Sequence, residues 1–170
     1  MPTRRQFLKY GVAGTLLLAA AGATRGQAIY RPASGGEPLA VLSTRDREVL
    51  AAIAPAILAG TPAASQPVDA IVGSVDRAIA GLPPHLQAEV RQLLALLASW
   101  PGRRWIAGVR SAWRDASRDE VAAFLESWRF SRWVLLQQGY HAIHDLTLAA
   151  WYARPDSWSA IGYPGPPEVK

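Results

Sequence analysis

Residues 68–81 read VDAIVGSVDRAIAG, the clearest structural signal in the chain. Their apolar members recur at steps of three and four, the spacing that places side chains on one face of an α-helix: Val68, Ile71, Val72, Val75 and Ile79. Gly81 follows where a helix C-cap is expected. The stretch therefore predicts an amphipathic helix that buries one face against other helices.

Two further helices are expected on either side of this stretch. Ser43 and Asp46 have the spacing of an N-cap followed by an acid in the first turn. The helix that they open extends to Gly60, with a kink at Pro55. The next helix opens at Pro83-Pro84, because proline is tolerated in a first turn, and its leucines continue towards position 100.

The C-terminal half continues with helical spacing. Residues 105–113 predict a helix that glycines weaken, and Ser117 with Glu120 forms a capping-box pattern before the next one. The last long helix is expected from Arg129 to Tyr152. No segment alternates apolar and polar residues for more than a few positions, so strands are not expected. The prediction is an all-α bundle of five or six helices within residues 43–152.

Length and composition restrict the possible chemistry. The 170 residues suffice for one domain, and 50% hydrophobic with 18% charged residues is typical of a globular chain. The absence of cysteine excludes disulfides, thiolate metal sites, covalently attached c-type haem and thiol nucleophiles. The glycine-rich motifs of dinucleotide and phosphate sites and the G-x-S-x-G motif do not occur. The sequence therefore shows no recognisable cofactor site of its own.

The first 23 residues have the pattern of an export signal. The twin-arginine motif is carried by Arg4, Arg5, Phe7, Leu8 and Lys9. The uncharged stretch Tyr10–Thr24 is shorter than the roughly 20 residues that span a bilayer, and Ala21 and Ala23 form a small-x-small cleavage pattern. We expect a cleaved twin-arginine signal over residues 1–23 and a twin-arginine translocase as a partner. A retained anchor and an ordinary secretory signal are the alternatives.

The charge balance changes once this signal is set apart. The chain has 18 basic and 13 acidic residues, and the signal holds three of the basic ones, which leaves 15 against 13, a net +2. Outside the signal, the basic residues form no cluster beyond Arg103-Arg104. Nucleic acid is therefore not expected as a partner. Residues 24–42, rich in Gly, Pro and Ser, predict a flexible arm before the bundle.

One group of side chains could bind a metal. His141, His144 and Asp145 are three and four residues apart, so His141 shares a helical face with each of the other two. A divalent ion would need a third ligand from another helix. The alternative, which we favour, is a structural role in hydrogen bonding or at an interface.

The chain has seven tryptophans, and six of them fall between Trp100 and Trp151. We expect Trp105, Trp113 and Trp128 to pack in the core because aromatic residues at helical spacing usually do. Trp and Arg are also enriched at interface hot spots. The candidate partner-binding residues are Arg129, Arg132, Trp133, Trp158, Tyr163 and Pro164. Residues 153–170 are expected to form an extended arm, because their prolines disfavour a helix. This arm covers either a partner or its own bundle.

Three features together resemble a known family. They are Leu42-Ser43 before a helix, the aromatic pair Trp151-Tyr152 that ends the last helix, and the motif Pro155…Trp158…Ile161-Gly162-Tyr163-Pro164-Gly165-Pro166. This pattern resembles the small subunit of periplasmic FAD-dependent sugar and alcohol dehydrogenases, the gluconate 2-dehydrogenase subunit 3 family.

The resemblance implies a helical, non-catalytic subunit without a cofactor. Its partner would be a large flavoprotein of the glucose–methanol–choline type that holds FAD. A cytochrome c subunit often completes such a complex, and the complex would be associated with the membrane. The small subunit would carry the folded large one to the periplasm. The competing hypotheses are a stand-alone periplasmic metal-dependent enzyme that uses His141 and His144, and a free-standing helical binding protein.

Overall fold

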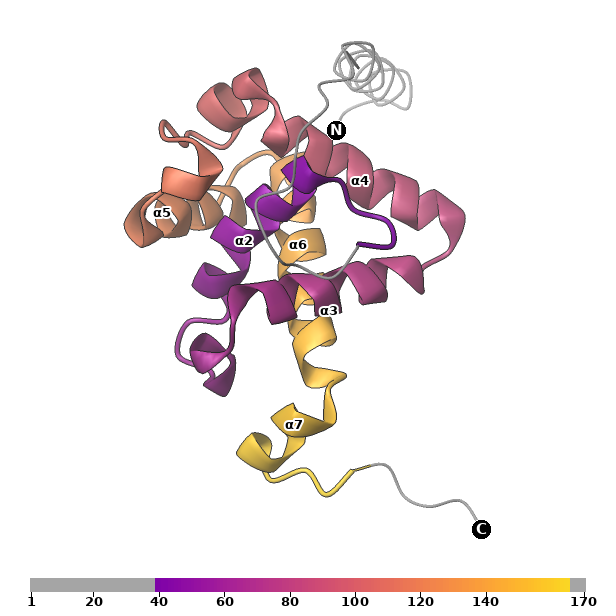
Figure 1. The fold of residues 1–170 in the computed structure, drawn as a ribbon. Helices are drawn as coiled ribbons and strands as arrows, with labels where there is room; N and C mark the ends of the chain where they lie inside the picture. The colour runs from indigo at the N-terminus through magenta and orange to yellow at the C-terminus, as the bar shows by residue number, and fades with distance from the viewer. Residues whose placement is uncertain (1–38, 166–170) are drawn as a thin grey trace.

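A computed structural model describes residues 39–165, which form an all-α bundle, as predicted (Figure 1). Its α-helices are α2 (Thr44–Ile57), α3 (Val68–Ala80), α4 (Pro84–Ala98), α5 (Arg118–Arg129), α6 (Val134–Tyr152) and α7 (Pro155–Trp158). Four short turns of other helix types are η1 (Pro62–Ser65), η2 (Gly102–Ile106), η3 (Trp113–Asp115) and η4 (Ser159–Ile161). Within this part of the chain there is no strand.

Helix α6 is the long element on which the other helices assemble, and α2, α3, α4 and α5 all contact it. Figure 1 shows α6 running behind α2 and α3, with α5 and α4 to either side of its upper part. The apolar stripe of α3 packs into this centre. Its residues Ile71, Val72, Val75 and Ile79 are buried as predicted, whereas Val68, in the first turn, is 38% exposed.

A buried carboxylate, which the sequence analysis did not single out, binds the residues that precede α2. Asp76 lies on the buried face of α3 and is 3% exposed. Its two oxygens accept hydrogen bonds from the backbone N–H groups of Ala40 (2.6 Å), Val41 (3.1 Å) and Leu42 (2.9 Å). A buried carboxylate is tolerated when donors satisfy it in this way. The last residues of the expected flexible arm are therefore fixed to α3, and we call this contact the Asp76 clamp.

A column of aromatic rings fills the core between η3 and α5. The Trp113 and Phe124 ring centroids are 5.8 Å apart, those of Phe124 and Trp128 are 4.9 Å apart, and both pairs are edge-to-face. The indole N–H of Trp113 donates to the Leu97 carbonyl (2.8 Å). The prediction that Trp113 and Trp128 are core residues is confirmed, since they are 4% and 2% exposed.

The same prediction is wrong for Trp105, which is 71% exposed. After α4 the chain turns tightly into η2, a single π-helical turn, instead of continuing as a helix to Trp113. Gly102 makes this turn possible, because a Cβ there would lie 1.8 Å from the Leu96 carbonyl oxygen. Trp105 and Trp113 therefore belong to different elements, and their helical spacing in sequence does not place them on one face.

One predicted helix start and one predicted helix cap also need correction. The last long helix begins at Val134, not at Arg129, because α5 ends at Arg129 and residues 130–133 form a connection. At the start of α5, the Ser117 hydroxyl accepts the Glu120 N–H (3.1 Å), as in a capping box. The Glu120 carboxylate, however, does not return to Ser117. It accepts the N–H groups of Arg110 and Ser111 instead, and so ties the preceding loop to α5.

The C-terminal segment is not fully extended. Pro155 occupies the first turn of α7, a position where proline needs no N–H partner, so this proline starts a helix instead of preventing one. The segment folds against the end of α6, where the Trp158 indole N–H donates to the Tyr152 carbonyl (2.9 Å). Gly162, with a φ of 70°, ends the helical turns.

Candidate docking surface

A group of large apolar side chains lies exposed at one end of the bundle. Its members, which we call the apolar end, are Trp100, Trp105, Ile106, Phe130, Trp133, Val134 and Leu135. Phe130, Trp133 and Leu135 expose 71%, 62% and 72% of their surface. Single exposed apolar residues are ordinary on a soluble protein, but a large group of them marks an interaction site.

Trp128 joins the two segments that supply the apolar end. Its indole N–H donates to the carbonyl of Ile106 in η2 (3.0 Å), and its six-membered ring packs on Gly139 of α6. Trp128 itself lies in the last turn of α5, directly before the α5–α6 connection, so η2 and this connection are held at the same end of the bundle (Figure 1). Trp105 of η2 also packs edge-to-face on Trp100, with ring centroids 5.0 Å apart.

Arginines border the apolar end and contact its rings. The Arg129 guanidinium lies 5.2 Å from the Phe130 ring centroid, and that of Arg132 lies 5.2 Å from the Trp133 ring centroid. Neither arginine forms an ion pair with another residue in the described range 39–165. The predicted partner-binding residues Arg129, Arg132 and Trp133 thus share one exposed surface.

The other predicted partner-binding residues lie at the opposite end of α6. Trp158, Tyr163 and Pro164 follow the C-terminus of this 19-residue helix, whose length is about 28 Å. The Trp158 and Tyr163 rings contact each other edge-to-face at 5.5 Å, with Tyr163 44% exposed. The structure therefore does not bring the two predicted groups together, and a partner that touched both would have to extend along α6.

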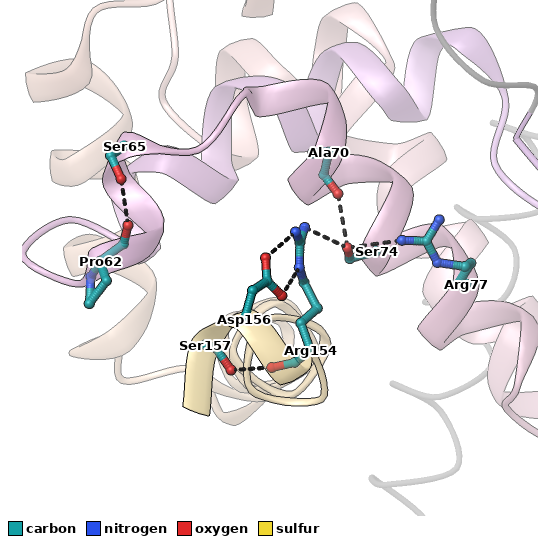
Figure 2. Close-up of polar contacts among 8 residues, drawn as sticks. All are labelled: Pro62, Ser65, Ala70, Ser74, Arg77, Arg154, Asp156 and Ser157. Carbon is teal, nitrogen blue, oxygen red and sulfur yellow. Dashed lines mark hydrogen bonds and ion pairs between the residues drawn. The ribbon is translucent and has the colours of Figure 1, made fainter. Parts of the chain in front are cut away.

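Arg154 attaches the C-terminal segment to α3 (Figure 2). Its guanidinium donates two hydrogen bonds to the Asp156 carboxylate, which lower the pKa of Asp156 below its usual range. The same guanidinium reaches the Ser74 hydroxyl of α3 at 3.4 Å, and Arg77 donates to that hydroxyl from the other side (3.2 Å). These contacts explain the fixed position of Arg154 without any ligand.

Two hollows lie elsewhere on the bundle. One, of about 500 Å³, is lined by small residues of α2 and η1 and by Trp113 and Arg114. The other, of about 550 Å³, lies beside the Asp76 clamp and is also lined by Leu39, Arg154 and Asp156. No residue of the apolar end lines either of these two hollows.

The candidate metal ligands make local contacts. His144 Nδ1 lies 2.9 Å from Asp145 Oδ1, and the His144 ring stacks on Tyr140 with centroids 5.1 Å apart. The His141 ring contacts the edge of Tyr140 at 5.3 Å. Among the residues that the structure describes, no group of three or more His, Asp or Glu side chains is placed to hold a metal ion. The contacts of both histidines fit the structural role.

The predicted export signal, with Arg4, Arg5, Phe7, Leu8, Lys9 and the cleavage residues Ala21 and Ala23, lies outside the described residues. In the described part, every helix is too short or too polar to cross a membrane. Comparison with known proteins adds no assignment, because no family model matches the chain and no curated protein or solved structure is significantly similar to it.

Proposed function

We propose that the chain is a non-catalytic accessory subunit that binds a large FAD-dependent dehydrogenase, stabilises it and carries it folded to the periplasm through the twin-arginine pathway. The observation that carries the proposal is the apolar end, bordered by arginines, on a chain whose sequence begins with a twin-arginine motif. In the family that the sequence resembles, a cytochrome c subunit often completes such a complex.

The composition of the apolar end supports a protein partner. It holds three tryptophans and one phenylalanine, with arginines beside them, and aromatic residues and arginine are the types enriched in interface hot spots. Water contact of so many apolar side chains would be unfavourable by about 25 cal/mol per Å², and a docked partner removes this cost. Because the twin-arginine pathway exports folded proteins, such a partner could bind in the cytoplasm and be exported as a complex.

The position of the chain's first described residues supports the carrier role. Leu39 and Ala40 line the same hollow as Arg154 and Asp156, which follow the C-terminus of α6. Trp133 caps the other end of the same helix. The described chain therefore enters the bundle near the end of α6 that is opposite the apolar end.

Co-purification from the native host tests the proposal. A C-terminally tagged chain should recover a protein with flavin absorbance in stoichiometric amount, and Trp133→Asp with Leu135→Asp should abolish recovery. The matched control is Leu86→Asp, since Leu86 is an apolar residue 37% exposed on α4, outside the apolar end. Recovery of the chain without a flavoprotein would refute the proposal.

The export role has a separate test. Arg4→Lys with Arg5→Lys should leave the flavoprotein in the cytoplasm, because the ammonium group lacks the planar donor fork of arginine. Arg45→Lys with Arg91→Lys is the control, since both arginines are exposed on the described bundle. Periplasmic flavin-dependent dehydrogenase activity at the wild-type level in the signal variant would show that the flavoprotein is exported by itself.

A further inference from the structure

We infer that the partner surface that covers the apolar end is itself apolar and is bordered by carboxylates, which pair with the arginines of this chain. The inference rests on the proposed function, because it describes how the flavoprotein subunit is recognised. It names the chemistry of the contact, which the resemblance and the export motif leave open.

The segments that build the apolar end carry only basic charges, although Glu120 of α5 interacts electrostatically with Arg103. These segments contain Arg103, Arg104, Arg129 and Arg132, and no Asp or Glu occurs at positions 90–114 or 127–144. The nearest acid in sequence is Glu126, one turn before Phe130 on α5. A partner that covered the rings without supplying negative charge would bury or crowd unpaired guanidinium groups, which is unfavourable. Carboxylates at the rim of the partner surface remove this penalty.

The geometry of the arginines favours carboxylate over other acceptors. Arg129 and Arg132 both lie over aromatic rings of the apolar end, at 5.2 Å from the ring centroids. This contact holds each guanidinium against an apolar surface, while its N–H edges stay available for a bidentate bond to a carboxylate. The rings and the guanidinium groups would thus be covered by one surface that is apolar inside and acidic at its edge.

The exposed face of α6 extends this surface and favours a protein over a membrane. Exposed residues follow from Leu135 at steps of three and four: Gln138, Ala142, Asp145, Ala149 and Tyr152. Such a stripe, with small side chains in its middle, lets a partner helix approach along α6. We therefore take the occupant to be a protein surface, and binding to lipid vesicles tests the alternative.

Charge reversal with kinetic measurement tests the inference. The probe is the flavoprotein that co-purifies with the tagged chain, immobilised after the two are separated. Arg129→Glu with Arg132→Glu should slow association at low salt by about tenfold or more, and the difference should shrink as salt is raised. The control, Arg45→Glu with Arg91→Glu, changes the same net charge on exposed residues of α2 and α4 and should slow association less than about twofold. Equal slowing by both variants would overturn the inference.

Photo-crosslinking identifies the surface independently. A photoreactive residue at Leu135 should crosslink a peptide of the flavoprotein that carries Asp or Glu beside apolar residues. Changing that acid to Arg should restore the binding of the Arg132→Glu variant. A crosslink and rescue with a protein that holds no flavin would support the carboxylate contact while refuting the proposed function. Binding to phosphatidylglycerol vesicles that Arg129→Glu with Arg132→Glu abolishes, without any protein crosslink, would overturn the inference.

Discussion

We predict that a side chain added at Gly139 destabilises the fold, and a second helical glycine, Gly73, provides the matched control. In Gly139→Ala the added Cβ would lie 2.6 Å from Cζ3 of the buried Trp128 ring. A Cβ cannot stay that close, so the ring or α6 must move. Gly73 also lies inside a helix, but a Cβ there would contact only the end of the Arg77 side chain, at 3.8 Å. The two substitutions therefore add the same methyl group, which meets a buried ring at Gly139 and only the end of a flexible side chain at Gly73.

The two substitutions should change the free energy of unfolding in opposite directions. Replacing glycine by alanine inside a helix stabilises by about 1 kcal/mol, and this gain is common to both variants. At Gly139 overpacking costs about 1–3 kcal/mol. Displacement of Trp128 also strains its 3.0 Å hydrogen bond to the Ile106 carbonyl, which contributes about 1 kcal/mol. We expect Gly139→Ala to lower the free energy of unfolding by about 1–3 kcal/mol, and Gly73→Ala to raise it by up to about 1 kcal/mol.

Urea denaturation followed by far-ultraviolet circular dichroism measures both changes. Trp128→Phe combined with Gly139→Ala should cost less than the sum of the single changes, because the smaller ring leaves room for the Cβ. If Gly139→Ala stabilises the chain as much as Gly73→Ala does, the packing of Trp128 against α6 described above is wrong. The same result would remove the argument that Trp128 holds the two parts of the apolar end together.

Three further predictions concern the polar contacts. Asp76→Asn should destabilise the chain by about 2–4 kcal/mol, because an amide cannot accept three N–H donors as a carboxylate does, and hydrogen exchange at residues 40–42 should accelerate. Burial raises the pKa of Glu120, but the N–H bonds from Arg110 and Ser111 outweigh it, so the folded pKa lies below the ordinary value of a glutamate carboxyl. The stability from Glu120 is therefore complete above that value and is lost as the pH falls through the folded pKa; Glu120→Gln should flatten the acid limb of a stability–pH curve, and an unchanged limb would contradict this. Deletion of residues 154–170 should lower the melting temperature, through loss of the Arg154–Ser74 and Trp158–Tyr152 contacts, and change flavoprotein affinity less than about threefold, whereas lost affinity at an unchanged melting temperature would place docking in this segment.

The bundle could be predicted because local signals and core packing agree in its helices. The α3 stripe has one period along its length, and the capping box of Ser43 and Asp46 fixes the start of α2. Pro84 and Ser117 likewise mark the first turns of α4 and α5. Each of these signals depends on residues within one helix, so the sequence alone is sufficient.

The errors occur where one residue has a partner that is distant in sequence. Glu120 has the spacing of a capping box but accepts N–H groups about ten residues earlier. Trp105 has helical spacing to Trp113, but the tight turn at Gly102 separates them. Asp76 did leave a signal, because it lies four residues after Val72 on the apolar face of α3, where a charge needs a buried partner.

The Asp76 clamp determines how the bundle responds to a mechanical pull on the residues that precede it. Force applied before Leu39 reaches the three N–H bonds to Asp76 first and passes into the middle of α3, which packs against α6. The first turn of α2 lies behind these bonds and is shielded from the load until they break. All three bonds end on one carboxylate, so a pull on the preceding residues enters α3 at the single residue Asp76.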